Sequence, residues 1–398
     1  MTTHHGLKSC LLLILCLPGT ASSQVLPGID VLKNGGFSQL AGKRVGLITN
    51  HTGITRDGKS TVQVLHESDA INLVALFSPE HGIAGRLDQP NVADSKDTET
   101  GLKIYSLYGE ARRPTAAMLA GIDTLVFDIQ DIGCRFYTYI STMGEAMRAA
   151  SEQGLGFVVL DRPNPINGQV VEGPVLDAGS ESFVGFHTIP VRHGMTVGEL
   201  ALMFKDEMKL DLDLEVVKVT NWNRDSFFDT SGLLWVNPSP NMRSLTEALL
   251  YPGIGLLETT NLSVGRGTDT PFEVIGAPWI DGQRLAAELN QSDLPGARFV
   301  PLRFRPNASK FAGELCGGIN VIVTNREAFQ SLKTGWAIAR QLVALYPDSW
   351  EVARYNRLLA DKHVLTMIRG GATVPEIEAS YQAELTSFME RRGKFLRY

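Results

Sequence analysis

The sequence has few cysteines and therefore little scope for covalent cross-links. Four are present in 398 residues, and two of them, Cys10 and Cys16, lie in the first 23 residues. The remaining pair, Cys134 and Cys316, is too small for a disulfide framework, and it forms either one bridge or two buried thiols. A chain of this length with 43% hydrophobic residues is expected to fold around sizeable cores, with room for two domains.

An excess of basic residues is also missing. Lysine and arginine number 37 against 43 acidic residues, a formal charge of -6. Removing residues 1–23 would take away Lys8, their only charged residue, and change this to -7. A negative surplus argues against nucleic acid and anionic membranes as partners. Beyond residue 23, no apolar run reaches the length of a transmembrane helix, so we expect no membrane span.

The motifs of common cofactor and nucleophile sites are absent. No G-x-G-x-x-G follows a predicted strand, and we find no Walker loop, H-E-x-x-H, G-x-S-x-G or S-x-x-K. We therefore predict no cofactor. Four residues carry side chains that bind divalent metals, but without a diagnostic spacing, so no metal site is predicted: His81, Asp128, Asp131 and His193.

The first residues read as a secretory leader. Lys8 precedes the apolar residues 11–17, which are too few to span a bilayer, and small residues follow up to Ser23. We expect cleavage near Ser23 and a periplasmic or secreted protein. A lipoprotein anchored at Cys16 is less favoured, because Leu15 stands where a lipobox carries a small residue.

Two units follow the leader. From residue 45 to about 220, strand-like and helix-like runs alternate, which predicts βαβ units and a mostly parallel sheet in an α/β domain over residues 24–249. An irregular segment, 221–244, leads to a second unit over 250–398. The predicted strands are 45–48, 73–77, 124–127, 157–160, 214–219, 298–304 and 318–324. The predicted helices are 115–120, 139–153, 196–208, 282–290 and 326–345.

Four of the predicted strands end at clusters of polar residues, at 49–53, 78–82, 128–139 and 161–165. In open α/β sheets the ligand crevice lies outside the carboxyl ends of the strands. We therefore expect these clusters to meet in one pocket.

Glu80 is the sharpest candidate for chemistry. Pro79 and Gly82 make a corner after the second strand, which would project Glu80 into the crevice. A shielded carboxylic acid there can act as a general acid. The alternative is a glutamate that braces its loop.

The third cluster contains two carboxylates, Asp128 and Asp131, followed by Arg135 and Tyr137. Two neighbouring acids can divide the ionised and protonated roles, and we expect at least one to face substrate. Alternatively, Asp131 pairs with Arg135 and fixes the loop. Tyr137 can bond or stack on a sugar ring, or simply pack in the wall.

Other loops carry candidate ligand contacts. Pro163 and Pro165 fix the backbone and so help hold Arg162 and Asn164 in place, which suits either ligand orientation or loop architecture. Arg266 lies between two glycines, which would let its guanidinium approach a carboxylate. His193 precedes a helix start, where a bonded structural role is favoured over substrate contact.

Taken together, these motifs resemble one family. Residues 78–82, 128–139, 161–165, 237–242 and 258–268 are similar to the NamZ family of exo-β-N-acetylmuramidases, and the resemblance runs from about residue 45 to the C-terminus. It implies a Rossmann-like domain, a smaller C-terminal α/β domain and an active site between them. It implies release of N-acetylmuramic acid (MurNAc) from the non-reducing end of peptidoglycan-derived MurNAc–GlcNAc saccharides.

The resemblance also suggests roles. Glycoside cleavage needs an acid, for which Glu80 is the candidate, and a group that attacks or stabilises the sugar cation. For that second role Asp131 is the first choice, Asp128 and Glu258 follow, and attack by the substrate's own acetamido oxygen would need only an orienting group such as Tyr137. The expected substrate contacts are His81, Asp128, Arg135, Arg162, Asn164, Asn241, Glu258, Asn261 and Arg266.

Two other functions stay open at this point. One is a metal-dependent hydrolase of another ester or amide, and the other is a non-catalytic binding module for muropeptides. The sequence assigns no oligomeric state.

Overall fold

A computed structural model describes residues 1–2 and 24–398. The predicted leader and its apolar run lie outside the described residues. Within the described part, no helix is both long enough and apolar enough to cross a bilayer.

A seven-stranded sheet forms the first domain, in the order β3-β4-β2-β1-β5-β6-β9. Only β3 is antiparallel to its neighbour. Numbered along the chain, the six parallel strands lie in the order 3-2-1-4-5-6, which is the Rossmann arrangement. The mostly parallel α/β sheet predicted from the sequence is thus confirmed. The strands are β1 (Arg44–Thr49), β2 (Asn72–Ser78), β3 (Ser95–Lys96), β4 (Lys103–Ser106), β5 (Thr124–Asp128), β6 (Gly156–Leu160) and β9 (Leu214–Val217).

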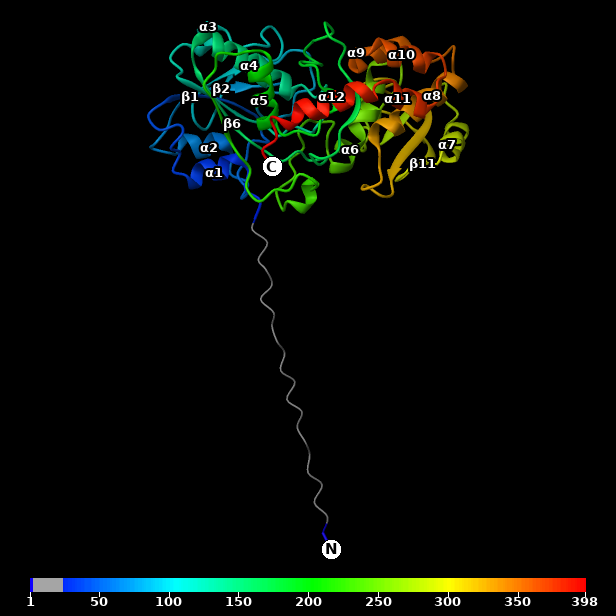
Figure 1. Ribbon diagram of the computed structural model, residues 1–398, viewed down its shortest axis with the longest axis horizontal. Helices are drawn as coiled ribbons and strands as arrows, with labels where there is room; N and C mark the ends of the chain where they lie inside the picture. Colours follow the sequence, from blue (N-terminus) through cyan, green and yellow to red (C-terminus); the bar gives the residue numbers. More distant parts are fainter. Residues whose placement is uncertain (3–23) are drawn as a thin grey trace.

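Both faces of this sheet are covered by helices. Side chains alternate between the two faces along each buried strand, so each of these strands contributes to both cores. On β5, Val126 packs in one core, whereas Leu125 and Phe127 pack in the other. Helices α1 (Gly28–Asn34) and α2 (Thr61–His66) close the first core. The second core is closed by α3 (Ala116–Leu119), α4 (Tyr139–Gln153) and α5 (Val197–Glu207). Figure 1 shows α1 and α2 on one side of the strands and α3 and α4 on the other.

The second domain is built on a three-stranded antiparallel sheet in the order β10-β12-β11. The middle strand β12 and the edge strand β11 match predicted strands, but the other edge strand, β10, was not predicted. The helix after this sheet, α8, starts at Ser331 rather than at the predicted residue 326. The reason is a turn, in which the Asn325 side chain accepts hydrogen bonds from the backbone amides of Glu327 and Ala328. The elements are α6 (Leu245–Ile254), β10 (Val274–Ala277), α7 (Gly282–Gln291), β11 (Ala297–Phe304), β12 (Cys316–Val323), α8 (Ser331–Leu345), α9 (Asn356–Leu359), α10 (Lys362–Arg369), α11 (Val374–Ser380) and α12 (Gln382–Gly393).

A small hairpin of β7 (Glu172–Val175) and β8 (Pro190–Arg192) joins the two domains at their border. The last helix, α12, packs against β7, and Figure 1 shows it running back toward the first domain. Cys134 and Cys316 are both buried free thiols, which decides between the two alternatives for this pair.

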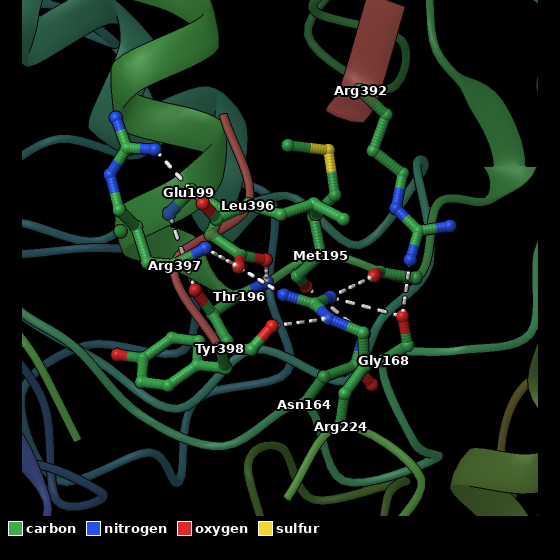
Figure 2. A network of polar contacts seen from close by, with 12 residues as sticks. Asn164, Gly168, Met195, Thr196, Glu199, Arg224, Arg392, Leu396, Arg397 and Tyr398 are labelled. Atoms are coloured by element: carbon green, nitrogen blue, oxygen red, sulfur yellow. Dashed lines mark hydrogen bonds and ion pairs between the residues drawn. The ribbon is translucent and has the colours of Figure 1, made fainter. Parts of the chain in front are cut away.

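The C-terminal residues are fixed on the first domain by a polar network (Figure 2). Arg392 donates to the carbonyl of Gly168 at 2.6 Å, and the backbone amide of Arg397 donates to Glu199 at 2.8 Å. Arg224 also bonds Glu199 and the carbonyl of Gly168. The last residues of the chain are therefore packed on the Rossmann-like domain.

Candidate active site

The crevice where a doubly wound sheet usually binds its ligand is filled by the protein itself. At the switch point between β1 and β5, Arg162 binds Asp128 through two bonds of 2.5 and 2.9 Å, and both side chains are buried. The Thr61 hydroxyl also donates to Asp128. The space left beside this pair is about 20 Å³, roughly the room for a single water. Asp128 and Arg162, both expected to contact substrate, thus bind each other.

A cavity of about 530 Å³, called the main cavity below because it holds half of the predicted site residues, lies instead between the two domains. Its size suits a small-molecule ligand. The predicted site residues that line it are Glu80, His81, Tyr137, Asn241, Glu258 and Arg266. The structure therefore unites half of the predicted residues in one place, and it brings in others that were not predicted.

Glu80 is held in the wall of this cavity at the end of β2. His81 has a φ of 70° and Gly82 one of 72°, so the chain turns sharply just after Glu80. The Thr138 hydroxyl donates to the Glu80 carboxylate instead of capping its own helix, α4. Tyr108 lies beside it: burial raises the pKa of Tyr108, and the Glu80 carboxylate raises it further. The Thr138 hydroxyl therefore holds the candidate acid, and the neutral phenol of Tyr108 lies beside it.

Tyr137 is a further aromatic residue in the lining of this cavity. Its side chain is 8% exposed, and its oxygen has no hydrogen-bond partner among residues 1–2 and 24–398. Burial raises the pKa of Tyr137 well above the ordinary value, so the phenol is protonated at neutral pH. Edge-on contacts with Tyr139 and Tyr251, at centroid distances of 5.0 and 5.8 Å, hold the ring. A buried, unpaired donor is costly unless a ligand completes it.

Three charged residues in the cavity wall bind one another and link the two domains. Arg266 binds Asp88 through bonds of 2.7 and 2.8 Å and also binds Glu258, while Asn241 donates to Asp88 at 3.0 Å. Burial opposes the charge on Arg266, but its two carboxylate partners prevail and raise its pKa. The guanidinium was expected to be free for a substrate anion, whereas here it holds two acids of its own. Asp88 gave no signal in the sequence, because it lies in an irregular loop without a motif.

The cavity also has basic residues that sequence reasoning missed. Lys310 donates to the carbonyl of Glu258, and burial lowers its pKa. Arg354 pairs with Glu351 at 2.6 Å, whereas Arg357 has no hydrogen bond or ion pair with any described residue. They lie in loops and short helical turns, so no motif could have marked them.

Asp131 lies outside the cavity lining. One carboxylate oxygen accepts the Gly133 amide at 2.7 Å and faces the ring of His193 at 3.5 Å. The other ring nitrogen of His193 is contacted by the Met195 amide at 3.2 Å. Both residues thus stabilise their own loops, which is the role that the sequence favoured for His193. The position of Asp131 gives no support to its role as the second catalytic group.

The side chains of Arg135, Asn164 and Asn261 likewise bond other parts of the protein instead of lining the cavity. Arg135 is fully buried and donates to four backbone carbonyls, two in each domain, at Pro174, Ile189, Leu358 and Leu359. Burial lowers its pKa to about 10. It makes no salt bridge with Asp131, the alternative considered above. Asn164 donates to the Met195 carbonyl, and Asn261 bonds the backbone of Ser349 and Glu351, so neither lines the cavity.

The arrangement favours proton-transfer chemistry on a polar ligand. Among the described residues, no three His, Cys, Asp or Glu side chains are grouped in a way that could hold a metal ion. The cavity instead combines a hydroxyl-bound carboxylate, a neutral tyrosine, a second carboxylate and several basic groups.

Comparison with known proteins identifies relatives over most of the chain. Residues 45–246 match the model of the N-terminal domain of exo-β-N-acetylmuramidase NamZ, and residues 249–398 match that of its C-terminal domain. The peptidoglycan β-N-acetylmuramidase NamZ of Bacillus subtilis (strain 168) is 45% identical over 94% of this chain and 92% of its own length.

Two crystal structures of DUF1343 family proteins from Bacteroides fragilis NCTC 9343 have the same architecture. One is 38% identical with a TM-score of 0.88, and the other is 32% identical with a TM-score of 0.77. Each comparison covers 94% of this chain and 99% of the other. The chain therefore belongs to the NamZ family of exo-β-N-acetylmuramidases.

Proposed function

We propose that this protein is an exo-β-N-acetylmuramidase that hydrolyses MurNAc from the non-reducing end of peptidoglycan fragments, with Glu80 as the general acid. One observation carries the assignment of the acid. Glu80 lies in the wall of the interdomain cavity, fixed by Thr138, and Tyr137 belongs to the same lining.

In the proposed reaction, the bond between the anomeric carbon of MurNAc and the oxygen of the neighbouring GlcNAc breaks. Glu80 gives its proton to the leaving oxygen, which keeps the electron pair of the broken bond. Water supplies a hydroxyl to the anomeric carbon, and its remaining proton restores the acid. This division of labour is the general one for glycoside hydrolysis.

For the second role we propose Glu258 rather than Asp131. Of the three carboxylates considered for it, only Glu258 lines the cavity that holds Glu80. Its carboxylate is held by a bond from Arg266, which would keep it in place beside the sugar. Tyr137 would donate its free hydroxyl to the substrate and orient the reacting sugar.

MurNAc differs from GlcNAc by a lactyl carboxylate, so discrimination needs a basic group. We assign that contact to Lys310. It is half-buried in the cavity wall, and it has no carboxylate partner among the described residues. Arg266, in contrast, is already bound to two carboxylates.

We also propose that the protein acts outside the cytoplasm, as a periplasmic or secreted enzyme. Support comes from the leader-like residues 1–23 and from the location of peptidoglycan itself.

The test is MurNAc release from purified MurNAc–GlcNAc by the wild type and by Glu80→Gln. Loss of the acid should lower kcat by about 100-fold or more while the protein stays folded. Glu215→Gln, an exposed glutamate on β9, is the matched control and should retain full activity. Normal turnover by Glu80→Gln would remove Glu80 from the acid role. Binding without product by the wild type would instead indicate a muropeptide-binding module.

A further inference from the structure

A second hollow continues from the main cavity on the other side of Glu80. It has a volume of about 430 Å³, and Glu80, Tyr108, Thr138, Val184 and Arg357 line both spaces. The candidate acid therefore stands at the junction of two connected compartments rather than at the end of one.

The second hollow is basic. Arg112 and Arg357 line it, and neither makes an ion pair with any residue in the described part of the chain. Glu80 is the only acidic residue in its lining. The next residue, Arg113, differs because it pairs with Glu152 on the surface.

Arg112 is also held in place by aromatic side chains. Its guanidinium lies 4.6 Å from the centroid of the Phe183 ring and 5.8 Å from that of Tyr108. Such stacking leaves the guanidinium edge free and lowers the entropy lost when it binds a carboxylate. The hydroxyl residues Ser180 and Ser182 line the same hollow.

A general acid must reach the oxygen between two sugars, so the substrate has to lie across Glu80. If MurNAc occupies the main cavity, as the proposed function requires, the second hollow takes the leaving part of the chain. The first leaving sugar, GlcNAc, is neutral and gives no reason for two unpaired arginines. In an alternating chain the next residue is again a MurNAc, which carries a carboxylate.

We infer that the second hollow is a binding site for the leaving chain, in which Arg112 and Arg357 bind a carboxylate of the muramyl residue beyond the leaving GlcNAc. This inference rests on the proposed function. It makes the protein an enzyme that prefers oligosaccharides over the disaccharide. The carboxylate has two sources, a free lactyl group or the peptide stem attached to it.

The experiment measures kcat/KM for MurNAc release from four substrates. These are MurNAc–GlcNAc, MurNAc–GlcNAc–GlcNAc with a neutral third sugar, and MurNAc–GlcNAc–MurNAc–GlcNAc with and without peptide stems. The enzymes are the wild type, Arg112→Gln, Arg357→Gln and the control Arg113→Gln. We expect the wild type to prefer at least one tetrasaccharide over both neutral-ended substrates by about tenfold, the usual effect of one good charge-assisted contact.

Arg112→Gln and Arg357→Gln should each reduce this preference, whereas Arg113→Gln should keep it. A preference confined to the stem-free tetrasaccharide identifies the lactyl carboxylate, and one confined to the stem-bearing chain identifies the peptide. Equal kcat/KM on all four substrates in the wild type would overturn the inference but leave the proposed function intact. An equal loss on all four in Arg112→Gln would also overturn it. Absence of MurNAc release from every substrate would overturn the proposed function and the inference together.

Discussion

The hydroxyl of Tyr398, the last residue of the chain, donates to the carboxylate of Asp161 at 2.6 Å, across a separation of 237 residues. Asp161 directly follows β6 and also accepts bonds from the Thr196 hydroxyl at 2.7 Å and the Gly198 amide at 2.8 Å. Tyr398 thus completes the polar contacts between the end of β6 and helix α5. Figure 2 shows Tyr398 near Thr196, next to the network around Glu199 and Arg224.

Tyr398→Phe tests this contact. The ring keeps its edge-on packing on Trp222, while the hydrogen bonds to Asp161 and from the Val219 amide are lost. We expect the free energy of unfolding to fall by about 1–3 kcal/mol, since a buried carboxylate loses a donor. Chemical denaturation measures it, with Tyr105→Phe as the control, because the Tyr105 hydroxyl makes no hydrogen bond to the described residues. Equal stability of both variants would contradict a stabilising role.

Asp161 predicts a pH dependence of stability. Burial raises its pKa from 3.8 to about 6, against the opposing effect of its hydrogen bonds. Because the folded state then binds the proton more tightly than the unfolded chain, this group's contribution to stability falls as the pH rises from about 4 to about 6. Asp161→Asn removes this titration, so its unfolding free energy should decline less with pH over that range than that of the wild type. The exposed Asp213→Asn is the control, and parallel curves for Asp161→Asn and wild type would contradict the prediction.

Thr138 should act as a positioning residue for Glu80. Thr138→Val removes the hydroxyl that holds the carboxylate, and we expect kcat to fall about tenfold with little change in KM, since positioning affects the reaction step most. Thr138→Ser keeps the hydroxyl and should restore most of the activity. A fall in stability without any change in kcat would indicate a purely structural role.

Arg135 should matter for stability and not for substrate contact. In Arg135→Met, four buried carbonyls from two domains lose their donor, and we expect the unfolding free energy to drop by about 3–5 kcal/mol. The exposed Arg44, which pairs with Asp123, provides the control, and Arg44→Met should change stability little. Full stability of Arg135→Met with a raised KM would contradict this assignment.

Chelation separates the glycosidase from the metal-dependent hydrolase considered above. The proposed reaction uses only side chains and water, so MurNAc release should persist after exhaustive EDTA treatment and dialysis. Loss of activity that returns on adding a divalent cation would favour the metal-dependent alternative.

The sequence by itself determined the class of the first domain and singled out Glu80 as the candidate acid. Short apolar runs and the alternation of strand-like with helix-like runs can be read from the chain itself, so residues 45–48, 124–127 and 157–160 were identified as strands without knowledge of their spatial neighbours. The corner around Glu80 was equally local, because Pro79 restricts the backbone and Gly82 permits a positive φ, whatever lies elsewhere in the chain. Motif resemblance extended this to the family.

Only the tertiary structure decided which polar residues share the cavity. Asp128 and Arg162 stand at strand ends like Glu80, yet they pair with each other and fill the switch point. Arg135 bonds carbonyls that lie more than 200 residues away in the sequence. Lys310 and Arg357, in contrast, line the cavity from the second domain. The physical reason is that a polar side chain binds whichever partner the packing of distant segments brings within about 3 Å, and no pattern within a segment encodes that distance.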